Sequence, residues 1–147
     1  MNPVKKIEDE VSLWPGVTVH AHRFGGREFR FGKAEVGHVH VGGTVDIPLP
    51  RPVHDALLSK RLVQEHRWVP DSGWVTFFAR SEEDCARALW LMRISYLRYA
   101  LKEAADPRGF FERESRSLDL GPELKALLER FLPREATSGE GAKLARV

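Results

Sequence analysis

Apolar and polar residues alternate over most of the first half of the chain, a pattern that predicts short strands joined by tight turns. Glycine and proline separate these segments, and beyond Pro50 the apolar spacing becomes that of amphipathic helices, interrupted by two further extended stretches. The expected strands cover residues 17–24, 27–31, 34–41, 44–49, 66–69 and 74–78, and the expected helices cover residues 52–62, 82–102 and 122–131.

The order of these elements predicts an α+β domain. Strands joined by short turns form an antiparallel sheet, here of about five to six strands, with roughly two or three helices packed on one face. We expect a single domain over residues 14–133, preceded by an N-terminal segment of residues 1–13. Residues 134–147 are polar and contain glycine, which predicts a disordered tail. A loop around residues 107–109 is expected before the last helix.

Composition limits the classes of protein to consider. The chain has 147 residues, of which 42% are hydrophobic and 30% charged, with a net charge of +2. This balance is typical of one globular domain, and no dense basic block favours a nucleic-acid partner. No apolar run approaches the roughly 20 residues that a membrane span needs. A single cysteine, Cys85, excludes an internal disulfide, and residues 1–10 lack an apolar signal core, so we expect a cytoplasmic protein.

His38 and His40, in the third expected strand, are the first candidates for a functional site. Alternate residues of a strand leave the backbone on the same side, so these two imidazoles lie near enough to hold one ligand. Whether Asp46 joins them depends on the loop at Gly42 and Gly43. A two-residue turn directs Asp46 away from the histidines, whereas a three-residue loop or a bulge brings it to their face. We expect the two-residue turn.

A second pair, His20 and His22, lies in the first expected strand. With a two-residue turn at residues 25–26, the phenylalanines of the following strand fall opposite this pair, Phe29 opposite His22 and Phe31 opposite His20. We therefore expect these two histidines to pack over aromatic rings and to have a structural role.

The candidate residues are compatible with several chemistries. We favour a metal-free acid/base site, in which histidines deprotonate an enol or lactone and hold the resulting anion. In the alternative, a divalent metal such as zinc or iron binds to histidines and a carboxylate. The third alternative is a ligand-binding or interaction domain without catalysis. The acid/base histidines are His38, His40 and His66, the metal alternative adds Asp46 or Glu35 to them, and the expected substrate contacts are Asp46, Trp68, Asp71, Ser72 and Trp74.

The segment that contains His66 and the two tryptophans leads to further expectations. Side chains of His38, His40 and His66 should line one cavity, with Trp74 mostly buried beside it and Trp68 more exposed. Ser72 is the nucleophile candidate nearest to a histidine, but its neighbours lack the flanking glycines of a nucleophile elbow, so we expect a turn residue there.

Several segments together resemble the luciferase domain of fungal luciferases and of small bacterial proteins, over roughly residues 14–100. The resemblance implies a small-molecule substrate, a hydroxylated styrylpyrone or a related enol, which reacts with molecular oxygen without a known cofactor. The segments that carry it are Ala34 to His40, Thr44 to Ile47, Gln64 to His66, Trp74 to Phe77, and Ser81 to Tyr96.

The resemblance assigns catalytic positions to Glu35, His38, His40 and His66. The chain departs from the fungal pattern at Asp46, where the fungal strand tends to carry another histidine, and residues 1–13 do not resemble the N-terminal membrane segment of the fungal enzymes. A fainter likeness, to small antiparallel domains of the YjbR type, agrees with the α+β class expected above.

Overall fold

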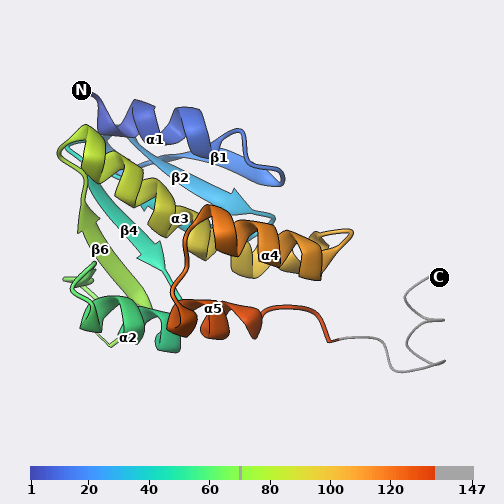
Figure 1. The fold of residues 1–147 in the computed structure, drawn as a ribbon. Coiled ribbons are helices and arrows are strands. Elements are labelled where there is room, and N and C mark those ends of the chain that lie inside the picture. The colour runs from blue at the N-terminus through green and yellow to red at the C-terminus, as the bar shows by residue number, and fades with distance from the viewer. Residues whose placement is uncertain (70, 135–147) are drawn as a thin grey trace.

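The computed structural model describes residues 1–69 and 71–134 and contains a six-stranded antiparallel sheet with the strand order β1-β2-β3-β4-β6-β5 (Figure 1). The described residues form five α-helices and one short 3-10 turn, η1, at Arg23–Gly25. The expected α+β class is confirmed. The expected tail falls, except for Arg134, outside the described residues. The strands are β1 (Val17–His22), β2 (Gly26–Phe31), β3 (Ala34–Val39), β4 (Thr44–Pro48), β5 (Gln64–Glu65) and β6 (Trp74–Phe78), and the helices are α1 (Pro3–Val11), α2 (Arg51–Ser59), α3 (Glu82–Glu103), α4 (Pro107–Ser117) and α5 (Pro122–Glu129).

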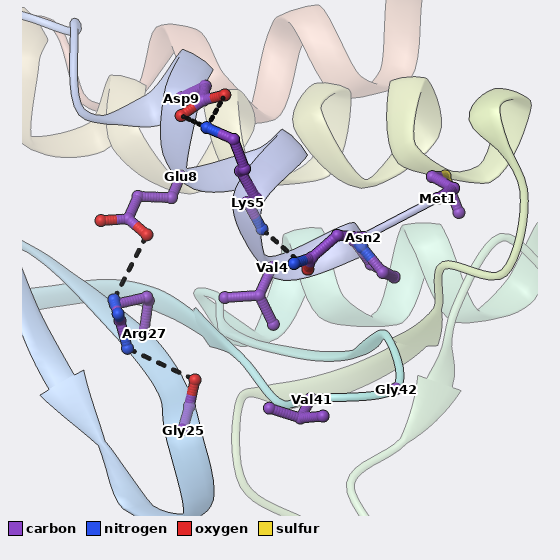
Figure 2. Close-up of a pocket in the computed structure, with 11 residues that line it drawn as sticks. Met1, Asn2, Val4, Lys5, Glu8, Asp9, Gly25, Arg27, Val41 and Gly42 are labelled. Carbon is purple, nitrogen blue, oxygen red and sulfur yellow. Dashed lines mark hydrogen bonds and ion pairs between the residues drawn. The ribbon is translucent and has the colours of Figure 1, made fainter.

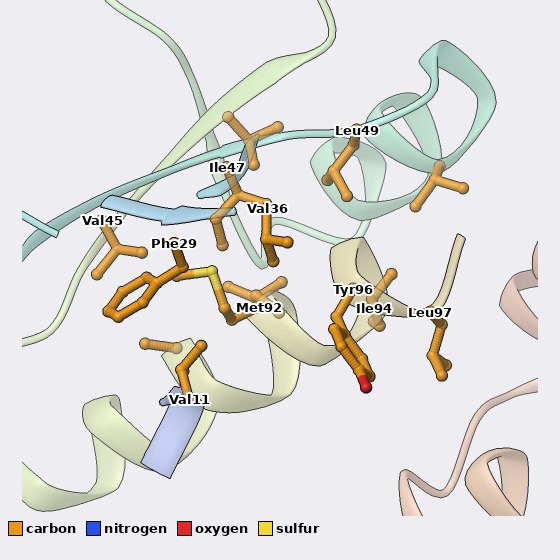
Figure 3. Close-up of a cluster of buried hydrophobic side chains, with 14 of the residues drawn as sticks. Val11, Phe29, Val36, Val45, Ile47, Leu49, Met92, Ile94, Tyr96 and Leu97 are labelled. Carbon is orange, nitrogen blue, oxygen red and sulfur yellow. The ribbon is translucent and has the colours of Figure 1, made fainter. Parts of the chain in front are cut away.

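One face of the sheet is covered by α1 and α3, and the core lies between these helices and the strands. Figure 3 shows Phe29 and Ile47 from the sheet beside Met92 from α3. All three side chains are fully buried. Burial of large apolar side chains is the main stabilising contribution to such a domain, at about 25 cal/mol for each square ångström removed from water.

Helix α3 begins where the sequence predicts. The Ser81 hydroxyl accepts a hydrogen bond from the backbone N–H of Asp84 at 3.0 Å, and three acidic residues occupy the first turn, where they interact favourably with the helix dipole. Further along the helix, buried Ser95 donates its hydroxyl hydrogen to the carbonyl oxygen of Val36 at 2.8 Å. This bond fixes the helix against β3, which contains His38 and ends next to His40.

Two helices lie where the sequence analysis expected none. Helix α1 covers most of the N-terminal segment and buries Ile7 and Val11 in the common core. The expectation of a loop around residues 107–109 is wrong, because α4 begins at Pro107. Asp106 caps it by accepting a hydrogen bond from the backbone N–H of Gly109 at 3.1 Å, and proline is favoured in a first helical turn.

The turn between β3 and β4 differs from the expected one. His38 pairs with Asp46, and Val39 pairs with Val45. This register places His40 opposite Thr44, so the loop between them has three residues instead of two. The backbone N–H of His40 donates to the carbonyl oxygen of Thr44 at 2.8 Å. The longer loop shifts the register by one residue, and Asp46 therefore shares a face with the histidines. The expectation that Asp46 faces away is wrong.

Gly43 holds this loop in place. Its N–H donates to the carbonyl oxygen of His40 at 2.9 Å, and its own carbonyl oxygen accepts a hydrogen bond from the N–H of Ala79 at 2.8 Å. Its φ is +99°, a conformation that glycine adopts readily and other residues avoid. The loop thus links the end of β3 to the residue that follows β6.

Replacing Gly43 by alanine should destabilise the chain more than the same change at Gly42. Both glycines have positive φ, so each alanine incurs backbone strain of about 1–3 kcal/mol. A Cβ on Gly43 would also lie 2.1 Å from the Ala79 carbonyl oxygen, whereas one on Gly42 meets nothing within 4 Å. In urea unfolding we expect Gly43→Ala to cost at least about 2 kcal/mol more than Gly42→Ala. Equal losses would contradict this structure of the loop.

The turn between β1 and β2 also differs from the expected one. The chain reverses through η1, where Phe24 has φ +58° and Gly25 φ +82°, and His22 pairs with Gly26. As a result His20 pairs with Glu28, and Phe29 pairs with Val19. The expected packing of both histidines over phenylalanines is therefore wrong, because this register places the phenylalanines on the helix-covered face and both histidines on the opposite face.

Arg27 ties this turn to α1. Its guanidinium donates to the carbonyl oxygen of Gly25 at 3.3 Å and forms an ion pair with Glu8 at 3.2 Å (Figure 2). The two contacts join the first helix to the turn that follows His22. A hollow lies beside these contacts and is lined by α1, by the β1–β2 turn and by the β3–β4 turn. None of the candidate site residues lines it.

Candidate functional site

The sheet face that α1 and α3 leave uncovered carries a continuous polar row. One residue of each strand contributes to it, and neighbouring members are direct cross-strand partners, so their side chains emerge on the same side. In sheet order the row is His20, Glu28, His38, Asp46, Thr76 and Gln64. A half-buried strand face is ordinarily filled by β-branched and aromatic residues, so the buried polar residues at the middle of this row, His38, Asp46 and Thr76, indicate a site.

Asp46 is the centre of this row and is almost completely buried. Its Oδ2 atom lies 3.1 Å from Nε2 of His38 and 2.9 Å from Nε2 of His40. Its Oδ1 atom accepts a hydrogen bond from the Thr76 hydroxyl at 2.6 Å. One carboxylate oxygen therefore faces two imidazoles, while the other is fixed by the neighbouring strand.

Outer carboxylates orient two of the histidines. Glu35 Oε2 lies 2.6 Å from Nδ1 of His38, and Glu28 Oε1 lies 3.3 Å from Nδ1 of His22. The His22 and His38 rings are stacked with centroids 4.0 Å apart, and the His40 ring meets both edge-on. We call His22, His38, His40 and Asp46 the cluster. In it, both nitrogens of His38 face carboxylates.

The environment of the cluster shifts three pKa values. Burial by itself lowers the pKa of His38, but hydrogen bonds to Asp46 and Glu35 outweigh burial and raise that pKa to about 9. Burial likewise opposes ionisation of Asp46, yet its hydrogen bonds, that from His38 foremost, lower its pKa to about 2. The pKa of His22 is lowered by burial and by the charge on His38. The cluster therefore favours an ion pair of His38 and Asp46 and disfavours a second positive charge on His22.

His66 approaches the cluster from the segment that follows β5. Its Nε2 atom lies 3.6 Å from Oδ1 of Asp46, and its Nδ1 atom accepts a hydrogen bond from the backbone N–H of Trp68 at 3.1 Å. This contact places the ring hydrogen of neutral His66 on Nε2, toward the cluster. The expected convergence of His38, His40 and His66 is confirmed, although 25 residues lie between His40 and His66 in the chain.

The two tryptophans occupy different positions. Trp74 is half-buried, and its ring packs against His38 and His66 at centroid distances of 5.5 and 6.0 Å. Trp68 is 78% exposed, as expected. Its ring lies under the Arg67 guanidinium at 5.1 Å. Trp74 therefore supports the cluster from the side, whereas Trp68 stands at the surface.

An open cavity of about 800 Å³ lies over the cluster. Its volume is in the range of small-molecule sites, roughly 300–1,000 Å³. The imidazoles and Asp46 contribute the polar lining, and the outer rim is aromatic and basic. The lining residues are His22, Arg23, Phe24, His38, His40, Thr44, Asp46, His66, Arg67, Trp68, Val69, Thr76 and Phe78.

Three expected substrate contacts, Asp71, Ser72 and Trp74, are not among the residues that line this cavity. Ser72 donates its hydroxyl hydrogen to the carbonyl oxygen of Val69 and accepts from the backbone N–H of Trp74 at 3.2 Å, as a turn residue does. Asp71 is exposed, with φ +66°, and its backbone N–H donates to Glu65. Neither Ser72 nor Asp71 therefore belongs to the cluster. Their contacts lie within the turn and serve to hold its conformation.

His22 is the member of the cluster that sequence reasoning missed. The alternation of His20 and His22 along a strand was visible, but only the register of the first hairpin decides what they face. Within the described part of the chain, the side chains arranged so that they can hold a metal are His22, His38 and His40, with ligand atoms within 4.8 Å of one another. Such a cluster can exchange protons, hold an anion or bind a metal ion.

Comparison with known proteins gives one match. Residues 33–95 match the family model of the luciferase domain, a range that contains β3, β4, β6 and most of the cluster. No curated protein and no solved structure matches the chain. None of the helices formed by residues 1–69 and 71–134 is long and apolar enough to span a membrane.

Proposed function

We propose that this chain, which carries a luciferase domain over residues 33–95, binds an enolic, pyrone-like small molecule over the cluster and adds molecular oxygen to it. The observation that carries the proposal is the position of Asp46 beneath two imidazoles at the floor of a ligand-sized cavity. A carboxylate in this position fixes the orientation and the tautomer of a histidine that acts on a substrate.

His40 is the group that would accept the enol proton. Its Nε2 atom is occupied by Asp46, which leaves Nδ1 as the basic nitrogen of the neutral ring. Its side chain is 31% exposed, more than that of His38 at 11%. His38 is held between two carboxylates and is suited to provide positive charge beneath the enolate, and His66 to donate a hydrogen bond from Nε2 to an enolate oxygen.

The proposed step balances without an external electron donor. The enol gives its proton to His40, the electron pair of the enolate carbon forms a bond to one atom of molecular oxygen, and the resulting peroxide anion takes the proton back. Ligand and oxygen thus become one hydroperoxide. The rim side chains Phe24 and Trp68 offer flat apolar surface to a conjugated ring.

An oxygen electrode with mass analysis of the product tests this function. With a hydroxypyrone as the probe, we expect uptake of one oxygen molecule per molecule consumed and a product heavier by two oxygen atoms. His40→Gln should reduce the rate by about 100-fold, the usual contribution of a general base. His20→Gln, which changes a histidine that hydrogen-bonds to Thr18, should not alter the rate. Uptake that is absent, or equal in wild type and His40→Gln, would contradict the proposal.

A further inference from the structure

The cluster also has the arrangement of a metal centre, and we propose that one divalent transition-metal ion, zinc or ferrous iron, binds in it. This inference goes beyond the proposed function and does not depend on an enolic ligand. The ligands are His22, His38, His40 and Asp46.

The spacing of the ligand atoms supports this assignment. Zinc bonds of about 2.0–2.2 Å to nitrogen and oxygen place neighbouring ligand atoms about 3 Å apart. Oδ2 of Asp46 already lies 3.1 Å from Nε2 of His38 and 2.9 Å from Nε2 of His40. The third imidazole, that of His22, has a ligand atom within 4.8 Å of the ligand atoms of His38 and His40. Side-chain rotations that draw the His22 ring toward Oδ2 of Asp46 would close the site.

The surroundings orient the ligands as they do in known metal sites. A metal-bound histidine ordinarily directs its second nitrogen to a carboxylate or carbonyl group. Here Nδ1 of His38 faces Glu35 at 2.6 Å, and Nδ1 of His22 faces Glu28 at 3.3 Å. The same outer contact occurs at two of the three histidines, and each leaves Nε2 as the remaining ligand atom.

The choice of atoms fits a transition metal. Three imidazoles and one carboxylate suit zinc or ferrous iron, whereas calcium and magnesium prefer oxygen ligands. A dication would be balanced by the charges of Asp46 and of Glu35 behind His38. It would replace the hydrogens that the imidazoles share with Asp46, and the cavity leaves the outer side of the ion accessible to a ligand.

The structure replaces one ligand of the metal set expected from the sequence. His66 lies 3.6 Å from Oδ1 of Asp46, and the Thr76 hydroxyl already binds that oxygen at 2.6 Å. The other carboxylate oxygen, Oδ2, lies beside Nε2 of His38 and of His40, and the His22 ring is stacked on that of His38. His66 is therefore an outer contact, and His22 takes its place among the ligands.

Metal titration of the purified chain tests the proposal. The chain would carry a tag without histidines, be freed of metal with a chelator, and then be titrated with zinc, and with cobalt as a coloured substitute. We expect one ion per chain and a cobalt absorption spectrum of four- or five-coordination. His22→Gln should weaken binding by about 100-fold or more, and Glu35→Gln by about 10–100-fold.

His20→Gln is the matched control, because His20 lies two residues from His22 on the same strand face and contacts Thr18. It should leave zinc affinity unchanged. Glu35→Gln changes an outer contact only, so it reports on the site even where the loss of a ligand impairs folding. Failure of the wild type to bind zinc stoichiometrically, or equal affinity of wild type, His22→Gln and Glu35→Gln, would overturn the proposal.

The titration contains metal alone, so its failure is distinct from failure of the proposed function. A chain that binds no metal but takes up oxygen with a hydroxypyrone would retain His40 as the proton acceptor. A chain that binds metal and requires it for oxygen uptake would assign the enolate oxygen to the ion instead.

Discussion

Replacing Asp46 by asparagine should weaken binding of a hydroxypyrone by about tenfold or more and also destabilise the fold. The carboxylate contacts His38, His40 and Thr76 at once, and hydrogen bonds that involve a charged group are worth about 1.5–3 kcal/mol each. Without it, His38 retains Glu35 as its only carboxylate, and the orientation of His40 is lost. We expect a loss of about 2–3 kcal/mol in the free energy of unfolding, measured in urea.

Asp71→Asn is the matched control for this prediction. Asp71 is an exposed aspartate in a turn, and asparagine also tolerates its positive φ of 66°. Tryptophan fluorescence should report unchanged affinity for the hydroxypyrone and an unchanged urea midpoint. An Asp46→Asn variant that binds the probe as well as Asp71→Asn does would show that the cluster does not hold the ligand.

Truncation of Phe29 to alanine should produce the largest loss of stability of any change discussed. Its ring is fully buried between β2 and the helices, and removal of a buried phenylalanine side chain costs about 3–5 kcal/mol. The residue faces away from the cluster, so any protein that remains folded should keep its affinity for the probe.

Phe24→Ala is the contrasting change. Phe24 is 88% exposed at the rim of the cavity, so its loss should change the free energy of unfolding by no more than about 0.5 kcal/mol. The affinity for a hydroxypyrone should fall instead. Chemical unfolding and fluorescence titration of both variants measure the two effects, and the assignment of Phe24 to the ligand site is wrong if both variants bind the probe like the wild type.

The main elements of the fold follow from local sequence. The β-branched and aromatic run at residues 74–78 and the Ser81 cap specify β6 and the start of α3, because strand propensity and helix capping are local properties. The two unexpected helices carry the same kind of signal. Asn2 and Asp106 both cap a helix that has proline in its first turn, so both helices were predictable from these residues.

The composition of the site was only partly predictable, because it depends on two turns. Phe24 adopts a left-handed conformation that no local signal distinguishes, and this lengthens the first turn and brings His22 to the cluster. At the second turn, Gly42 and Gly43 permit loops of two or three residues. A hydrogen bond from Ala79, distant in sequence, selects the longer loop and so directs Asp46 to His38.

The residue types in the strands therefore predicted a site at His38 and His40. The presence of Asp46 and His22 beside them could be found only from the tertiary structure. A shift of one residue exchanges the two faces of a strand, and each turn of this sheet decides such a shift. The position of His66 was also only partly predictable from the sequence. Its convergence with His38 was expected from the residue types, but its contact with Asp46 depends on the course of the segment after β5.

The most direct test of the account is a nuclear magnetic resonance titration of metal-free wild-type protein with a hydroxypyrone. The ring nitrogens of all six histidines would be labelled with nitrogen-15 and followed during the titration. Four histidines line the cavity, while His20 contacts Thr18 and His54 is buried beside Glu65. We predict that the ring signals of His22, His38, His40 and His66 shift together and saturate at one ligand per chain, with His20 and His54 unchanged. Ring signals that do not move, or shifts of His20 and His54 alone, would contradict the central claim that the cluster binds the ligand.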